Sequence, residues 1–232
     1  MSSDASGCWI EVAAALLGGV AVTAIAGIVA GPSLGMVLGG LFAAVILLPP
    51  LAAVRRSLRQ RAAISAAMIG GIAIAWLALI GPGRATFFQW SLLVLLLASF
   101  AAALASLTVA VESLTASSTL AAAAGVVVGV AWLTWPIWLS PALAKGGSPR
   151  LIHILVETHP GLVANGLLTF TTPWTEQAVA YRLTVLDQDV AIQLPGNPLA
   201  AILANCLAAG ACIAVTNLNI TRYGSTGPTV SQ

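Results

Sequence analysis

Long apolar segments without a single charged side chain alternate with short polar segments along most of this chain. The uncharged segments cover residues 12–54, 62–83, 85–111, 113–144 and 190–221. A helix needs roughly 20 apolar residues to cross ~30 Å of hydrocarbon, because each residue adds ~1.5 Å to its length. Each segment is therefore long enough for one crossing. The first is long enough for two, and Gly31 and Pro32 divide it at its middle.

This pattern predicts six membrane-spanning helices. The predicted spans cover residues 10–30, 34–54, 62–80, 90–111, 120–139 and 199–218. Helices are favoured over barrel strands because the segments are continuously apolar and rich in Ala and Leu, without the alternation of lipid-facing strands. The predicted fold is an all-α integral membrane protein. Region 1–139 holds five spans, region 140–198 forms a loop, and a tail at 219–232 follows the sixth span.

Composition supports the bilayer as the main solvent of this chain. Charged residues make up 7% of the sequence and hydrophobic ones 59%, whereas soluble proteins carry about 25% charged residues. The net charge is only +2. So few basic residues cannot neutralise a run of phosphates, and we expect no nucleic-acid partner.

The basic residues predict which way the chain crosses the membrane. Between the second and third spans lies the segment RRSLRQR, which holds Arg55, Arg56, Arg59 and Arg61. Short loops rich in Lys and Arg stay on the cytoplasmic side. With six spans, both termini are then cytoplasmic and the loop 140–198 is extracytoplasmic. The predicted location is the inner membrane of a bacterium.

The long loop has the pattern of a structured element. Ser148 and Pro149 are typical of a helix start, and Pro160 limits this first helix to about ten residues, or half a bilayer. A second apolar arm follows, in which Asn165 and Gly166 predict a break. The segment 148–172 therefore resembles a re-entrant or interface-lying helical hairpin between the fifth and sixth spans.

A third helix is predicted after this hairpin. Residues 173–185 place Trp174, Ala178, Tyr181 and Val185 on one face. This amphipathic pattern is typical of a helix that covers the outer surface.

Aromatic and small residues mark further features of the spans. Trp132, Trp135 and Trp138 lie near the outer end of the fifth span, where they predict an aromatic belt at the membrane interface. A stripe that lines a substrate path is the alternative. Gly125 and Gly129, four residues apart, predict close packing between helices.

One group of polar residues in the loop has the composition of a metal site. His153 and Glu157 are four residues apart and share a helical face, and His159 follows. A catalytic zinc site needs three correctly aimed ligands, so an ordinary polar stripe is the favoured interpretation. No cofactor is predicted, and we expect no catalytic site in the chain itself.

The layout resembles the transmembrane subunit of an ABC-2-type exporter. The shared features are six spans, cytoplasmic termini, a basic turn after the second span and a hairpin between the fifth and the sixth. The resemblance implies that Arg55, Arg56, Arg59 and Arg61 contact a cytoplasmic ATP-binding subunit, and that the function is export as a permease. The alternative is a non-catalytic anchor or scaffold in a respiratory or assembly complex, packed against other membrane subunits.

Overall fold

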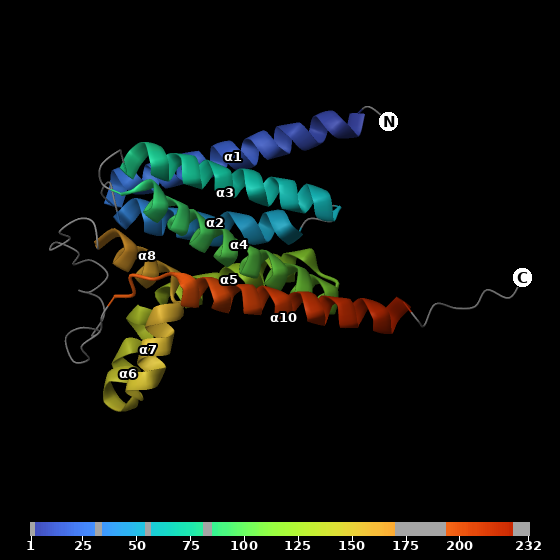
Figure 1. Ribbon diagram of the computed structural model, residues 1–232. Coiled ribbons are helices and arrows are strands. Elements are labelled where there is room, and N and C mark those ends of the chain that lie inside the picture. The colour runs from blue at the N-terminus through green and yellow to red at the C-terminus, as the bar shows by residue number, and fades with distance from the viewer. Residues whose placement is uncertain (1–2, 31–33, 54–56, 81–84, 170–193, 225–232) are drawn as a thin grey trace, which may run out of the picture.

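Helices make up nearly all of the described part of this protein (Figure 1). The computed structural model describes residues 3–30, 34–53, 57–80, 85–169 and 194–224. The long helices are α1 (Ser3–Ala30), α2 (Leu34–Ala53), α3 (Leu58–Ile80), α4 (Phe87–Thr115), α5 (Ser118–Trp138) and α10 (Leu199–Gly224). Between the last two lie the short helices α6 (Ser140–Gly146), α7 (Pro149–Thr158) and α8 (Pro160–Thr169).

Six of these helices are long and apolar enough to cross a membrane. They are the six long helices, so the prediction of an all-α, six-span membrane protein is confirmed. The predicted helical element between the fifth and sixth spans is also present, because α7 and α8 form a pair bent by 76° at a short break.

Capping explains why two spans begin earlier than predicted, at residues 58 and 87 in place of 62 and 90. Thr86 accepts a hydrogen bond from the Gln89 backbone, and the Gln89 side chain accepts one from the Thr86 N–H, so α4 already begins at Phe87. Ser57 and Gln60 make the same reciprocal pair before α3. Arg59 and Arg61 therefore lie in the first turns of α3, not in a loop.

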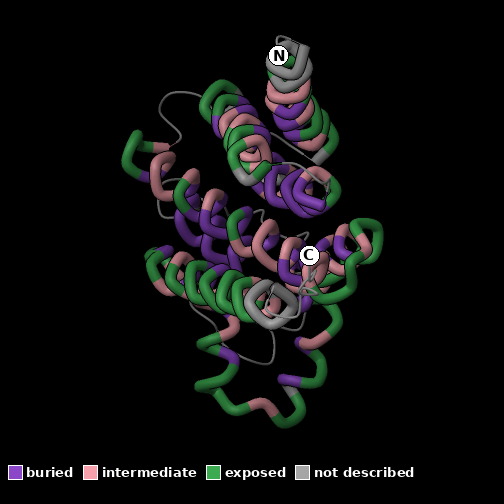
Figure 2. Tube along the Cα trace, turned by 90° about the vertical axis from the view of Figure 1, so that its right-hand side faces the viewer, coloured by how far each residue is buried: buried purple, intermediate pink, exposed green. Residues whose placement is uncertain are grey.

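The helix α2 lies at the centre of the bundle. It packs against α1, α3, α4, α5 and α8, whereas α10 packs mainly on α4 and α1 mainly on α3. The buried residues accordingly gather in the middle of the bundle, and α10 exposes much of its length (Figure 2). The helices α1 and α10 are the most lipid-accessible spans, since few of their residues are buried inside the protein.

The start of α1, the start of α3 and the end of α10 lie at one end of the bundle (Figure 1). We call this the basic end, because Arg59 and Arg61 are there. The helices α6, α7 and α8 lie at the opposite end, which we call the hairpin end.

Glycines bring the central helices into close contact. A Cβ atom added at Gly125 would lie 2.5 Å from the Thr108 hydroxyl and 2.8 Å from Pro49 Cβ. One added at Gly129 would lie 2.8 Å from a methyl group of Val45. All three distances are too short for real side chains, so the predicted role of these two glycines in helix packing is confirmed.

The outer pair α1 and α3 is built on a second, mutual glycine contact. A Cβ at Gly19 would lie 2.6 Å from the Met68 carbonyl oxygen, and a Cβ at Gly71 would overlap the carbonyl of Leu16. The obstacle in both cases is backbone, which cannot rotate away as a side chain can. These two glycines therefore set the distance between α1 and α3.

Hydrogen bonds from side chains connect neighbouring spans. The indole N–H of Trp76 in α3 donates to the Met36 carbonyl in α2 over 3.2 Å. On the other side of the bundle, the Asn205 amide in α10 donates to the Ser99 hydroxyl in α4 over 3.2 Å. Each bond fixes the rotation of one helix against its neighbour, because the donor is buried away from water.

The loop differs from its predicted structure in two places. The predicted break at Asn165 and Gly166 is wrong: α8 continues through both residues, and Gly166 instead allows the Pro195 carbonyl to approach closely. The short helix α6 was not predicted. The third helix, predicted at 173–185, lies outside the described residues.

Replacing Gly71 by Ala should weaken the contact between α1 and α3 and destabilise the protein by about 1–3 kcal/mol. The matched control is Gly70→Ala, since a Cβ at Gly70 meets nothing within 4 Å. That change should be neutral or stabilise by up to about 1 kcal/mol, because Ala has the higher helix propensity. Thermal unfolding in a mild detergent measures both. Equal effects of the two substitutions would contradict the proposed contact.

Candidate functional site

The hairpin end is closed by α8, which inserts between α2 and α4. Every residue from Pro160 to Leu168 is buried, although α8 is only ten residues long. The Gln89 side chain of α4 donates a hydrogen bond to the Leu167 carbonyl over 3.3 Å. This bond satisfies one of the last carbonyls of α8, which have no donor within the helix. The end of α8 is therefore tied to the start of α4.

His159 occupies the break between α7 and α8. The proline that follows disfavours helical backbone at this position, and His159 is extended with φ −83° and ψ 115°. Its carbonyl accepts a hydrogen bond from the Val163 N–H, and its ring Nδ1 accepts one from the Leu162 N–H over 2.9 Å. One residue thus ends α7 and caps α8.

The same imidazole ring contacts α5 at a proline. Because Nδ1 accepts a hydrogen bond, the ring proton lies on Nε2, which is 3.3 Å from the Leu133 carbonyl oxygen and donates to it. Pro136 has no N–H, so the neighbouring Trp132 carbonyl lacks its usual helical donor. The N–H of His159 therefore lies beside backbone carbonyls of α5 that Pro136 leaves with fewer helical donors.

This environment keeps His159 neutral. The side chain is 2% exposed, and burial lowers its pKa to about 4, although the backbone carbonyls of Leu133 and Trp132 act in the opposite direction. A proton on Nδ1 would also remove the acceptor that caps Leu162. His159 lies outside the six spans, in the bent pair at the hairpin end.

Two tryptophans of α5 enclose the ring. Trp135 contacts it edge to face, with ring centroids 5.7 Å apart, and Trp132 lies at 6.1 Å. Trp135 is 1% exposed and packs with Leu143 and Ile152 of α6 and α7. Helices of the loop therefore cover Trp135, and its place in the predicted aromatic belt, like that of Trp132, stays a prediction. Trp138 is exposed, and its place at the membrane interface stays a prediction.

The three candidate metal ligands do not come together. His153 Nε2 and Glu157 Oε1 are 3.1 Å apart on the exposed side of α7. His159 is buried on the other side of the break, and both of its ring nitrogens have backbone partners. Among the residues that the structure describes, no group of three His, Cys, Asp or Glu side chains could hold a metal ion.

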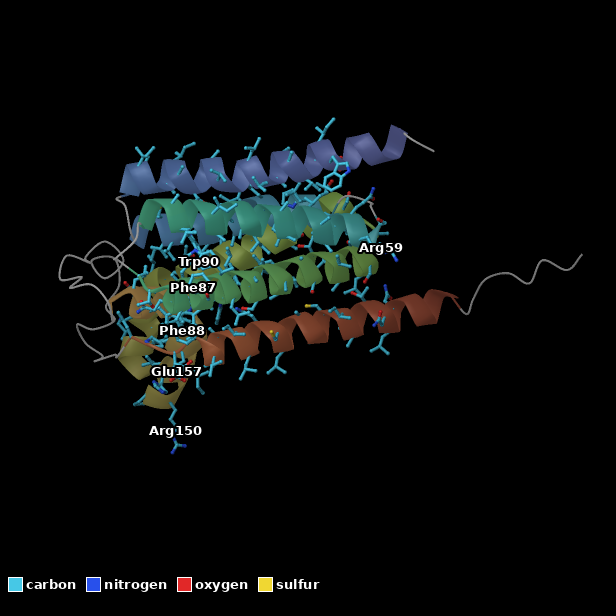
Figure 3. The ribbon with its side chains drawn as sticks, turned by 45° about the horizontal axis from the view of Figure 1, so that its top comes forward. Arg59, Phe87, Phe88, Trp90, Arg150 and Glu157 are labelled. Atoms are coloured by element: carbon cyan, nitrogen blue, oxygen red, sulfur yellow. The ribbon has the colours of Figure 1, made fainter. Side chains whose placement is uncertain are left out.

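At the basic end, Arg61 has a partner within the protein. Arg61 forms an ion pair with Glu112 at the end of α4, with Nη1 3.1 Å from Oε2 and both side chains mostly buried. Arg59 is exposed at this end, away from Arg150 and Glu157 at the hairpin end (Figure 3). Arg55 and Arg56 lie outside the described residues.

The helix α4 connects the two regions. Glu112 near its end holds Arg61 of α3, and Gln89 in its first turn holds Leu167 of α8. A displacement of α3 at the basic end would therefore act on the same helix that positions α8 at the hairpin end.

Comparison of the chain with protein-family models, with curated proteins and with solved structures found no match.

Lowering the pH from 7 to 4 should destabilise the fold through His159. The unfolded chain takes up a proton near pH 6.5 and the folded chain only near pH 4, so the lost stability grows between these values, to about 3 kcal/mol below both. Apparent melting temperatures of wild type and His159→Gln in detergent, measured across this pH range, check this.

The wild-type curve should fall more steeply than that of His159→Gln, because glutamine has no proton to gain in this range. The comparison variant is His153→Gln, which removes the exposed histidine of α7 and leaves the buried His159 in place. Parallel curves for wild type and His159→Gln would contradict the lowered pKa of His159 in the folded protein.

Proposed function

We propose that this chain is the permease subunit of an ABC-2-like export system in a bacterial inner membrane, with both termini in the cytoplasm. The observation that carries the proposal is the α7–α8 pair, bent by 76° between the fifth and sixth spans. It lies at the end of the bundle opposite Arg59 (Figure 3) and the start of α3, which also holds Arg61. Both features belong to the arrangement that resembles this type of exporter, with a docking site for an ATPase on one side and a hairpin on the other.

Contacts within the bundle supply a physical route between the two ends. An ATP-binding subunit that contacts the start of α3 would act on Arg61, and through its ion pair on Glu112 and α4. The opposite end of α4 holds α8 by the hydrogen bond from Gln89. In this proposal the hairpin closes the outer side of the bundle. It moves when the ATP-binding subunit acts on the basic end.

Proline residues in two spans are consistent with such movement. Pro49 and Pro50 interrupt the hydrogen bonding of α2, and Pro136 interrupts that of α5. A helix bends more easily where its backbone bonds are missing. The helix α2 lies at the centre of the bundle and α5 packs against it, so bending of either helix would change the contacts between spans.

Recovery of a cytoplasmic ATPase tests the proposal. The tagged full-length chain, extracted from bacterial membranes in a mild detergent, should carry an ATP-binding subunit identified by mass spectrometry and by ATP hydrolysis. The triple variant Arg55→Gln, Arg56→Gln, Arg59→Gln should lose most of this partner, because three charged contacts are removed. Arg61 is left in place because Glu112 would otherwise remain unpaired.

The control is Lys145→Gln with Arg150→Gln, which removes exposed positive charges from the hairpin end and should leave the ATPase bound. Absence of any ATPase from wild type, or its full retention by the triple variant, would contradict the proposal. Recovery with redox-cofactor proteins instead would favour the alternative of a scaffold subunit in a respiratory or assembly complex.

A further inference from the structure

The helices α6 and α7 form an arm that leaves the bundle sideways. Whereas the spans run parallel to one another, α6 and α7 run across them and extend past α10, as Figure 1 and the turned view of Figure 2 both show. The base of the arm is fixed by Trp135, around which Leu143, Ile152 and Val156 pack. Because the spans cross the bilayer, the arm lies roughly in the membrane plane at the hairpin end.

The surface of α7 has three distinct sectors. At about 100° per residue, Ile152 and Val156 share one sector, which is buried against the base of the arm. Arg150, His153 and Glu157 share a polar sector. Leu151 and Ile154 form the third, which is apolar and exposed at 46% and 56%. In water, this second apolar sector would be exposed without any apolar group to cover it.

Lipid surrounds the span α10, beside which the arm lies. The helix α7 packs against α10, which exposes Leu203, Leu207 and Leu218 along its length. In a membrane-spanning helix such side chains face hydrocarbon. The arm is therefore bordered by the boundary lipids of α10, at a depth where headgroups meet acyl chains.

Charge at the tip of the arm selects the headgroup. Lys145 at the end of α6 and Arg150 in the first turn of α7 are both exposed and lie on either side of the tip. The acidic residue of the arm, Glu157, lies at its base and is paired with His153. Two cations beside an exposed apolar sector complement a phosphate group above an acyl chain.

We propose that the α6–α7 arm lies on the bilayer surface at the hairpin end, with Leu151 and Ile154 among acyl chains and Lys145 and Arg150 on the phosphates of anionic phospholipids. This surface is independent of the proposed transport function, since it concerns neither the basic end nor an ATPase. The arm would fix the hairpin at a defined depth and bind one lipid class in preference to zwitterionic lipid.

The position of α7 can be measured with single fluorescent labels on the full-length chain in vesicles. After replacement of Cys8, Cys206 and Cys212 by Ala, a polarity-sensitive dye is attached to Leu151→Cys, Ile154→Cys or His153→Cys. The first two labels should be quenched by nitroxide lipids and shielded from aqueous iodide. The His153→Cys label should show the reverse, because it lies in the polar sector.

Lipid selectivity is read from the same Ile154→Cys label. Phosphatidylglycerol added to phosphatidylcholine vesicles should change the emission of this label. In the double variant Lys145→Gln with Arg150→Gln, the amount of phosphatidylglycerol that gives half of this change should rise by about fivefold for each charge removed. The control, Arg55→Gln with Arg59→Gln, removes two charges from the basic end and should have no effect. Higher salt should weaken the wild-type response, which tests the electrostatic part without any substitution.

Three results would overturn the proposal. Labels at Leu151 and Ile154 that iodide quenches as strongly as the one at His153 would place the arm in water. Labels shielded from both quenchers would show that a protein, either a second copy or another subunit, covers the apolar sector. A response to phosphatidylglycerol that is insensitive to salt and to Lys145→Gln with Arg150→Gln would exclude the two cations as the headgroup site.

Discussion

Backbone groups inside a bilayer have to find their hydrogen-bond partners within the protein, and this constraint governs the whole structure. Water is absent there, and each unpaired N–H or C=O costs several kcal/mol. Helices satisfy it along almost their entire length. Exceptions lie at prolines and helix ends, and at two of these places another element supplies a donor. His159 donates to α5 near Pro136, and Gln89 donates to the end of α8.

The same constraint explains why small residues matter so much in this bundle. Lipid is as apolar as the side chains it would replace, so association of the spans depends on close contact more than on exclusion of water. Gly19 and Gly71 let two backbones touch, and Gly125 and Gly129 admit groups of α2 and α4. The bundle is held by shape, supplemented by isolated hydrogen bonds such as that between Asn205 and Ser99.

The ion pair and the buried histidine lie at opposite ends of the bundle. At the basic end, the ion pair between Arg61 and Glu112 joins α3 to α4. At the hairpin end, His159 organises the break between two short helices and stays neutral because it is buried. The helix α4 reaches both ends, which gives the molecule one continuous element through which the proposed ATPase contact and the hairpin could be coupled.

The number of spans, their approximate positions and the short helix after Pro149 follow from the sequence by itself. Each depends on a local property, the length of an apolar segment or a proline at a helix start, that neighbouring residues define. The closeness of Gly125 and Gly129 to other helices could be predicted for the same reason, since small residues at helical spacing favour contact whatever the partner.

Only the tertiary structure decided which polar and aromatic residues act together. His153 and His159 are six positions apart, yet one is exposed and the other buried, because the 76° bend sends α7 outwards and α8 into the bundle. Trp135 is covered by α6 and α7 while Trp138 is not. Gly166 continues a helix where its sequence predicts a break. These outcomes depend on contacts between segments far apart in the chain, which no local pattern encodes.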